Sequence, residues 1–148
     1  MNSKEKNDLF YVCSLIEFIG RKTKNRRADI VDIIGKKEIS RQFDLAEVNH
    51  CLSFDEVEDE IIDYYQIAIG DFDSISNCKY SIPSVQSIGK VYERLISNTM
   101  LESDNIIDSI VKVFKSFISD EISDFNSSVY YSNPDYLKHS YLEGKLLA

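Results

Sequence analysis

The sequence lacks the patterns that mark several common classes of protein. It has no run of about 18 apolar residues without charges, so it predicts no membrane-spanning helix. Its five glycines are isolated and none belongs to a glycine-rich nucleotide-binding motif; we expect most of them where helices pause. Residues 1–8 are polar and predict no signal peptide, which favours a cytoplasmic protein.

Cysteine and histidine are few and poorly spaced for a metal site. The sequence has Cys13, Cys51 and Cys78, no CxxC pair, and only His50 and His139. Structural zinc usually takes four ligands arranged in spaced pairs, so we expect no metal and no cofactor. An odd number of unpaired cysteines is typical of free thiols in a reducing cytoplasm. The adjacent His50 and Cys51 could form a nucleophile pair, but no motif here positions them for catalysis.

The charge of the chain is negative and unevenly distributed. The formal net charge is −8 over 148 residues. Residues 1–41 hold 10 Lys/Arg and 6 Asp/Glu, whereas residues 42–73 hold 10 Asp/Glu and no basic residue. This balance argues against general nucleic-acid binding, which needs basic side chains at phosphates. It suits a protein that covers a basic surface.

The clearest helix is predicted over residues 52–69. Ser53 and Glu56 have the spacing of a capping box, and Leu52 and Val57 that of a hydrophobic staple. The inward face is expected to hold Phe54, Val57, Ile61, Tyr65 and Ala68. The outward face is expected to hold the acids Asp55, Glu56, Glu58, Asp59 and Asp63. The result is a core helix with an acidic outer face.

The same apolar periodicity recurs along the rest of the chain. It predicts helices near residues 7–20, 26–34, 37–49, 84–98, 103–125 and 134–143. Residues 71–83 are the least helical part, with a short extended piece as one interpretation. We therefore predict one all-α domain over 1–148, a compact bundle of six or seven amphipathic helices. Two sub-bundles, about 1–70 and 84–148, are expected to pack together.

A basic stretch follows the first helix. It contains Arg21, Lys22, Lys24, Arg26 and Arg27, and two short helices come after it, which invites a helix-turn-helix interpretation. The seven residues from Ala28 to Gly35 fit that motif poorly. The competing interpretation is that these cations pair with the acidic helix of the same molecule.

No catalytic constellation is visible. His139-Ser140-Tyr141 resembles half of a helical ribonuclease motif, but the arginine that should precede it is absent from residues 132–134. The acid pairs around Asp59 and Glu60 are typical of a solvated helix face. We therefore predict that the protein is not an enzyme, with a helical site near His50 or His139 as the weakest alternative.

Four tyrosines gather near the end of the sequence. They are Tyr130, Tyr131, Tyr136 and Tyr141. Tyrosine is enriched at interfaces because it buries area and keeps a polar tip, so these residues are candidates for partner binding. Tyr130 and Tyr131 are the better candidates, since core packing would also explain the other two.

The first half of the chain also resembles a small bacterial all-helical family of unknown function. The matching segments are residues 10–17, 28–34, 43–50 and 57–61, within a likeness that spans about residues 8–65. Members of that family are often encoded beside ADP-ribosyltransferase-like proteins. The resemblance implies an antitoxin-like or accessory partner with no catalytic residues, and it leaves residues 70–148 without a role.

The favoured hypothesis is a cytoplasmic, non-catalytic protein–protein interaction module. Its partner would carry a basic surface, a co-encoded toxin being one candidate, and would contact the acidic face or the tyrosine-rich end. A homodimer is compatible with the same features. The alternative is a DNA-binding regulator that uses the basic stretch 21–27.

Overall fold

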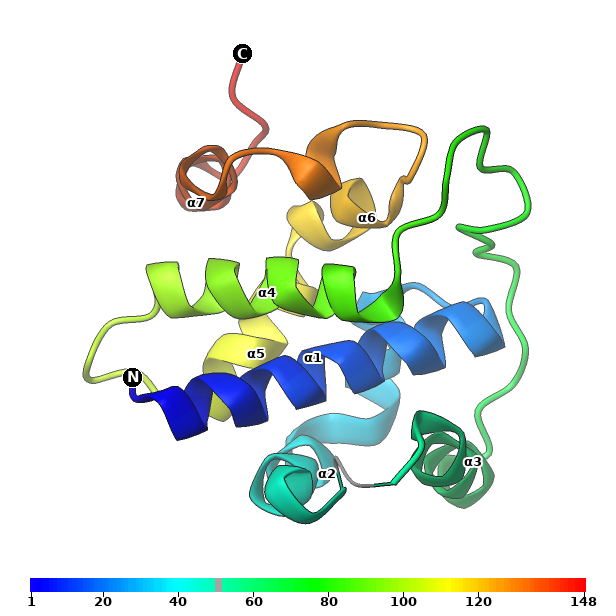
Figure 1. The fold of residues 1–148 in the computed structure, drawn as a ribbon. Helices are drawn as coiled ribbons and strands as arrows, with labels where there is room; N and C mark the ends of the chain where they lie inside the picture. The colour runs from blue at the N-terminus through cyan, green and yellow to red at the C-terminus, as the bar shows by residue number, and fades with distance from the viewer. Residues whose placement is uncertain (50–51) are drawn as a thin grey trace.

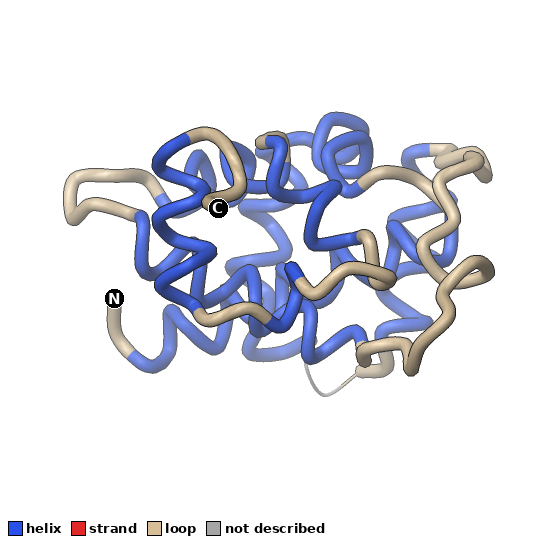
Figure 2. The backbone as a smooth tube through the Cα atoms, turned by 90° about the horizontal axis from the view of Figure 1, so that it is seen from above, coloured by secondary structure: helices blue, strands red, loops and turns tan. Residues whose placement is uncertain are grey.

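The computed structural model describes residues 1–49 and 52–148, and every regular element in these ranges is helical (Figure 2). The elements are α1 (Ser3–Thr23), α2 (Arg27–Asn49), α3 (Phe54–Tyr65), α4 (Val85–Thr99), α5 (Ile106–Phe114), α6 (Phe117–Ser123), the 3-10 helix η1 (Val129–Tyr131) and α7 (Pro134–Glu143). The prediction of an all-α bundle is confirmed. None of these helices combines the length and the apolar character needed to cross a bilayer.

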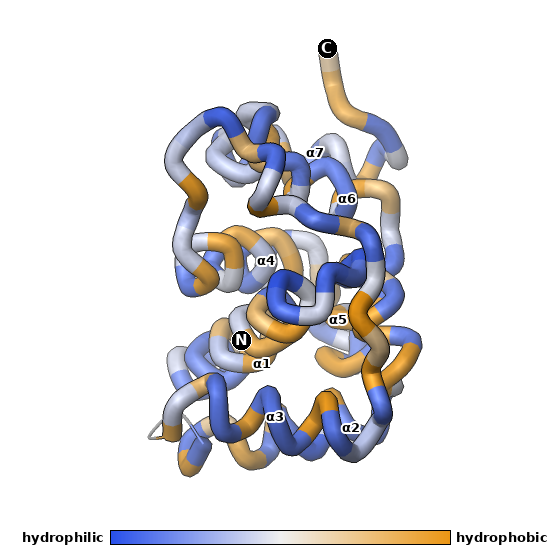
Figure 3. The backbone as a smooth tube through the Cα atoms, turned by 90° about the vertical axis from the view of Figure 1, so that its right-hand side faces the viewer, coloured by the Kyte–Doolittle hydropathy of each residue, from blue (hydrophilic) through white to orange (hydrophobic). Residues whose placement is uncertain are grey.

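Helices α1 and α4 lie side by side at the centre of the bundle (Figure 1). Helices α2 and α3 lie on one side of this pair and α6 and α7 on the other, while α5 packs against α2 (Figure 1). Apolar segments of α1 and α4 meet in the interior (Figure 3). Because the central pair joins the two halves of the sequence, the predicted sub-bundles share one core.

The central helix pair depends on a close approach at Gly89. A side chain at this position would overlap Ser14 of α1, so glycine allows the two backbones to come together. Beside this crossing, Tyr92 stacks on Phe114 with ring centroids 4.0 Å apart, and both side chains are fully buried. Gly89 lies inside α4, within the helix predicted near residues 84–98, and not at a helix end.

Gly20 is likewise inside a helix. The predicted end of the first helix at Gly20 is wrong, because α1 continues to Thr23 and ends at Lys24 in the left-handed conformation. The helix also begins earlier than predicted, with a capping box between Asn2 and Glu5. A side chain at Gly20 would overlap the side chain of Arg27, so glycine makes room here for a buried arginine.

The predicted pause at Gly35 is confirmed. Gly35 lies inside α2 with φ +76° and ψ 170°, which breaks the helix into two parts that match the predicted helices 26–34 and 37–49. This region of backbone conformation is essentially restricted to glycine.

Helix α3 is shorter than predicted. It ends at Tyr65, and Gln66 adopts the left-handed conformation with φ 53°, so residues 66–69 are not helical. The following segment docks on the end of α1, where the Gly70 amide donates to the Thr23 carbonyl at 2.8 Å and the Phe72 amide to the Lys24 carbonyl at 2.9 Å. These bonds satisfy carbonyls that a helix end otherwise leaves unpaired.

Ser53 does cap α3, accepting a bond from the Glu56 amide at 3.4 Å. The capping box and staple predicted there are not complete: the Glu56 side chain makes no return bond to Ser53, and Leu52 is 48% exposed.

The predicted helix over 103–125 is two helices. The chain breaks at Lys115 and Ser116 between α5 and α6, and α5 is capped by Asn105, so it starts at Ile106 and not at residue 103. The break lets the apolar residues of both short helices face the same core. Residues 71–83 contain turns and no strand, so the extended piece suggested for this connection is absent.

Candidate functional site

An exposed acidic face on α3 is the first candidate site. Its exposed acids are Asp55, Glu56, Asp59, Glu60 and Asp63, which we call the α3 acidic face. Asp59 lies 3.4 Å from Lys22 Nζ, while the other four form no ion pair with any cation in residues 1–49 or 52–148. These carboxylates therefore project unneutralised charge into solvent.

Glu58 does not belong to this face. Its side chain is fully buried, and Lys22 Nζ lies 3.3 Å from the carboxylate oxygens. Burial raises the pKa of Glu58, and the charge and hydrogen bond of Lys22 partly oppose that rise. The prediction that Glu58 points outward to a partner is wrong, because the helix turns this position toward α1.

The basic stretch forms a buried cluster around Glu17. Arg27 and Glu17 are both fully buried, and Arg27 donates from Nε and Nη2 to the two carboxylate oxygens at 2.9 Å each. Arg21 Nε donates to the same carboxylate at 2.7 Å. Burial alone would lower the pKa of Arg27, but Glu17 outweighs this effect and raises it. The cluster ties α1 to α2.

The other three cations of this stretch also pair with acids of the same chain. Arg26 contacts Asp120 of α6 at 2.8 Å, Lys24 lies 3.7 Å from Asp73, and Lys22 pairs with α3. Intramolecular pairing therefore occurs, and for the whole basic stretch the acids include residues of α1, α3, α6 and the connection after α3, not of the acidic helix alone. The DNA-binding prediction is wrong for Arg27, which is buried; Lys22, Lys24 and Arg26 remain about half exposed.

The four tyrosines near the C-terminus have different surroundings. Tyr131 is 68% exposed, and Tyr130 packs edge-on between Phe125 and Tyr131. Tyr136 is half-buried and donates its hydroxyl to the Leu147 carbonyl at 2.9 Å, and Tyr141 is half-buried against the core. Of the four, Tyr131 presents the most surface.

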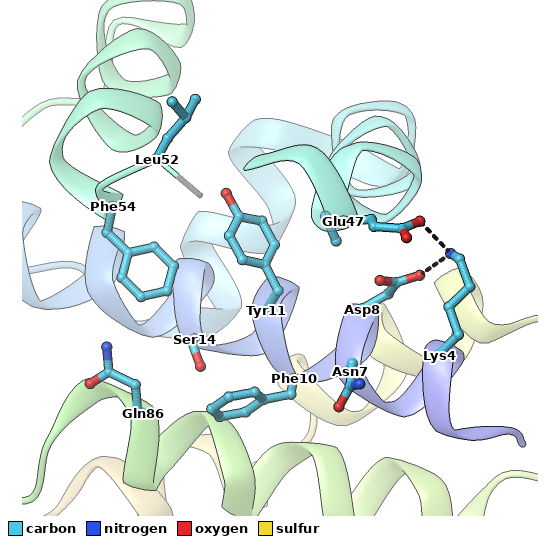
Figure 4. Close-up of a pocket in the computed structure, with 11 residues that line it drawn as sticks. Lys4, Asn7, Asp8, Phe10, Tyr11, Ser14, Glu47, Leu52, Phe54 and Gln86 are labelled. Atoms are coloured by element: carbon cyan, nitrogen blue, oxygen red, sulfur yellow. Dashed lines mark hydrogen bonds and ion pairs between the residues drawn. The ribbon is translucent and has the colours of Figure 1, made fainter. Parts of the chain in front are cut away.

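A cavity of about 720 Å³ lies between α1, the second part of α2 and the start of α3 and α4 (Figure 4). The rings of Phe10, Tyr11 and Phe54 line it, and Tyr11 stacks on Phe54 at 5.6 Å. At one end Lys4 bridges Asp8 at 2.7 Å and Glu47 at 3.8 Å (Figure 4). This volume is within the range of small-molecule sites.

The Tyr11 hydroxyl is one of several polar groups in this cavity, which also include Ser14, Gln86 and the ion pairs of Lys4. It is buried and makes no hydrogen bond of good geometry with a described residue. Burial raises the pKa of Tyr11 to about 12, and the side chain of Asn49 partly opposes the rise. The phenol is therefore protonated at neutral pH, and the cavity can hold an apolar group that carries a hydrogen-bond acceptor.

The residues weighed for catalysis are not brought together in the described structure. His139 lies exposed on α7, while His50 and Cys51 fall outside the described residues. Cys13 and Cys78 are free thiols, and burial followed by the charge of Glu93 raises the pKa of Cys13 well above its usual value. In the part of the chain that the structure describes, no three His, Cys, Asp or Glu side chains are placed to hold a metal ion.

Comparisons of the chain with protein-family models, with curated proteins and with solved structures found no match. The resemblance over residues 8–65 therefore stays a prediction.

Sequence reasoning missed several residues that the structure makes prominent. Glu60 belongs to the α3 acidic face, and Glu17 organises the buried cluster. A signal for Glu17 was present, because it is an acid among the apolar residues of the first helix, four residues before Arg21. Tyr11 carried no such signal, since its role depends on which helices surround it.

Proposed function

We propose that this protein is a cytoplasmic, non-catalytic interaction module whose α3 acidic face binds a protein partner with a basic surface. The observation that supports the proposal is that Asp55, Glu56, Glu60 and Asp63 are exposed and lack a cation partner in the described structure. Complementary charge speeds encounter and selects partners. The family resemblance adds that the partner is a toxin encoded beside this protein.

Internal neutralisation of the basic stretch supports the same proposal. All five cations between residues 21 and 27 pair with carboxylates of this chain, and of the α3 acidic face only Asp59 is among those carboxylates, so the other four acids of the face have no cation partner in the described residues. A partner would therefore meet negative charge over this helix, with the exposed ring of Tyr64 beside it. Tyrosine is enriched at interfaces relative to the rest of the protein surface.

The test is co-expression of the tagged chain with its neighbouring open reading frames. Mass spectrometry identifies what co-purifies, and light scattering gives the stoichiometry. We expect a stoichiometric complex that weakens at about 0.5 M salt, because screening shortens the reach of surface charges. A monomer that brings no partner would contradict the proposal.

Charge reversal then tests the α3 acidic face itself. The double variant E60K/D63K should weaken the complex at least about tenfold. Neither side chain pairs with a described cation, so the fold should tolerate the change. The matched control is E102K/E143K, which changes the net charge equally at exposed acids outside α3. Equal binding by the two double variants would remove α3 from the interface.

A further inference from the structure

A second surface, opposite in charge to the α3 acidic face, lies between α4, η1 and α7. It is a groove of about 660 Å³. Its lining, which we call the tyrosine groove, comprises Pro83, Ser87, Lys90, Val91, Arg94, Leu95, Tyr130, Tyr131, Ser132, Asn133, Pro134 and Leu137. Helix α7 lies over α4 in the bundle (Figure 1). The lining residues of the groove come from both helices and from η1.

The lining contains two cations and no carboxylate, in a chain whose net charge is −8. The five arginines of the chain differ in whether they have an acidic partner. Arg21, Arg26, Arg27 and Arg41 each form an ion pair with an acid of the same molecule. Arg94 is exposed and forms no ion pair or hydrogen bond with any described residue. The groove therefore contains an arginine whose guanidinium has no partner among the described residues.

Lys90 does not compete for the same role. Its ammonium pairs with Glu93 at 3.0 Å and lies 5.8 Å from the centre of the Phe10 ring. Arg94 is therefore the cation available to an incoming anion. A guanidinium presents two parallel N–H donors that match the geometry of a carboxylate.

The rest of the groove suits an apolar side chain. Leu95 and Leu137 are 2% and 3% exposed and form its floor with Val91, while the exposed ring of Tyr131 stands at its edge. Tyrosine and arginine dominate the binding energy of many interfaces because they bury large areas and keep polar contacts. Ser87, Ser132 and Asn133 add hydroxyl and amide groups that can bond a peptide backbone.

We propose that the tyrosine groove binds a short peptide segment that presents a carboxylate to Arg94 and an adjacent apolar side chain to the floor. We choose this ligand because the positive charge of Arg94 complements the negative charge of a carboxylate. A carboxylate is favoured over a phosphorylated side chain, because one unpaired cation matches a charge of −1 better than the charge of about −1.5 to −2 on a phosphomonoester. The site does not rest on the α3 acidic face, and it gives the chain a second docking surface of opposite preference.

The experiment follows the ¹⁵N signals of the full chain, including the arginine Nε–H groups, during peptide titration. The probes are capped peptides of roughly eight residues that place one glutamate near a leucine or phenylalanine, with matched glutamine and lysine versions. We expect saturable shifts at Arg94 and along the groove with the glutamate peptides, at a Kd of about 10–500 μM. The glutamine and lysine versions should bind at least about tenfold more weakly.

Variants separate the groove from general charge effects. Arg94→Gln should weaken glutamate-peptide binding about tenfold or more, whereas Lys112→Gln, an exposed cation on α5, should change it less than about twofold. Unchanged thermal unfolding verifies that each variant is folded. The proposal is overturned if no peptide shifts the groove at millimolar concentration, or if Arg94→Gln binds as well as the parent. Self-association that Arg94→Gln abolishes, without peptide binding, would instead assign the groove to a second copy of this chain.

Discussion

At the scale of single residues, one carboxylate has an unusually large structural role. Glu17 is fully buried and accepts hydrogen bonds from Arg27 and Arg21. Arg27 also donates to the Asn25 carbonyl at 3.0 Å and to the Ser74 hydroxyl at 3.2 Å. One arginine therefore connects α1, the turn before α2 and the long connection after α3. A charge buried in this way needs its partner, because an unpaired buried ion costs several kcal/mol.

Removal of that partner gives a direct prediction. Arg27→Gln leaves Glu17 buried with Arg21 as its remaining cation, so we expect a loss of about 3 kcal/mol in the free energy of unfolding. Urea denaturation followed by circular dichroism measures it.

The matched control is Lys36→Gln, which removes one side of an exposed pair with Asp108. Both of those side chains are about 60% exposed, so its cost should stay below about 1 kcal/mol. Equal stability of the two variants would show that the buried cluster contributes no more than a surface ion pair.

At the scale of elements, glycine decides where α2 bends. Gly35 adopts φ +76° and ψ 170° and divides the helix, and a side chain built there would meet no neighbouring atom. The requirement is therefore purely one of backbone conformation. Arg27 of the first part of α2 bonds Glu17 of α1, while Glu38 of the second part accepts a hydrogen bond from the Tyr65 hydroxyl of α3.

A substitution at Gly35 therefore tests the effect of backbone strain without steric overlap. Gly35→Ala should lower the free energy of unfolding by about 1–3 kcal/mol, because alanine disfavours this conformation although space is present. Denaturant titration would reveal the loss.

Gly144→Asn serves as the control, since Gly144 ends α7 in the left-handed conformation with φ +79° and ψ 13°, which asparagine tolerates. A loss at Gly144→Asn as large as that at Gly35→Ala would contradict the explanation from backbone strain.

At the scale of the whole molecule, charges that pair within the fold are separated from charges that remain unpaired at the surface. The positive stretch 21–27 is used to hold four elements together, while the α3 acidic face and the tyrosine groove keep charges that the fold leaves unpaired. The molecule therefore offers two surfaces of opposite sign. This arrangement suits a protein that bridges partners better than one that covers a nucleic acid.

We accordingly expect no specific DNA binding. In a gel-shift assay on the promoter of its own gene, no band should shift at about 150 mM salt, because too few cations are free to displace counterions from phosphates. A weak shift at about 50 mM salt that disappears with competitor DNA is compatible with this prediction. A shift that persists at the higher salt and depends on sequence would favour the DNA-binding alternative.

The sequence by itself determined the class of fold, because apolar residues spaced three and four apart lie on one face of a helix, and this spacing is a local property of the chain. It also located the bend at Gly35 and the span of α7 near residues 134–143, since both depend on neighbouring residues only. It did not locate the end of the first helix at Thr23, because Gly20 is needed there to admit Arg27 from another helix.

Only the tertiary structure decided which charges are free. Glu58 and Glu60 belong to the same run of acids, yet one is buried against Lys22 and the other is exposed. Arg27 and Arg94 differ in the same way. Arg27 forms a buried ion pair with Glu17, whereas Arg94 lines a groove and forms no ion pair with a described residue. The physical reason is that an ion pair between distant segments depends on how helices pack, and no local spacing encodes that packing.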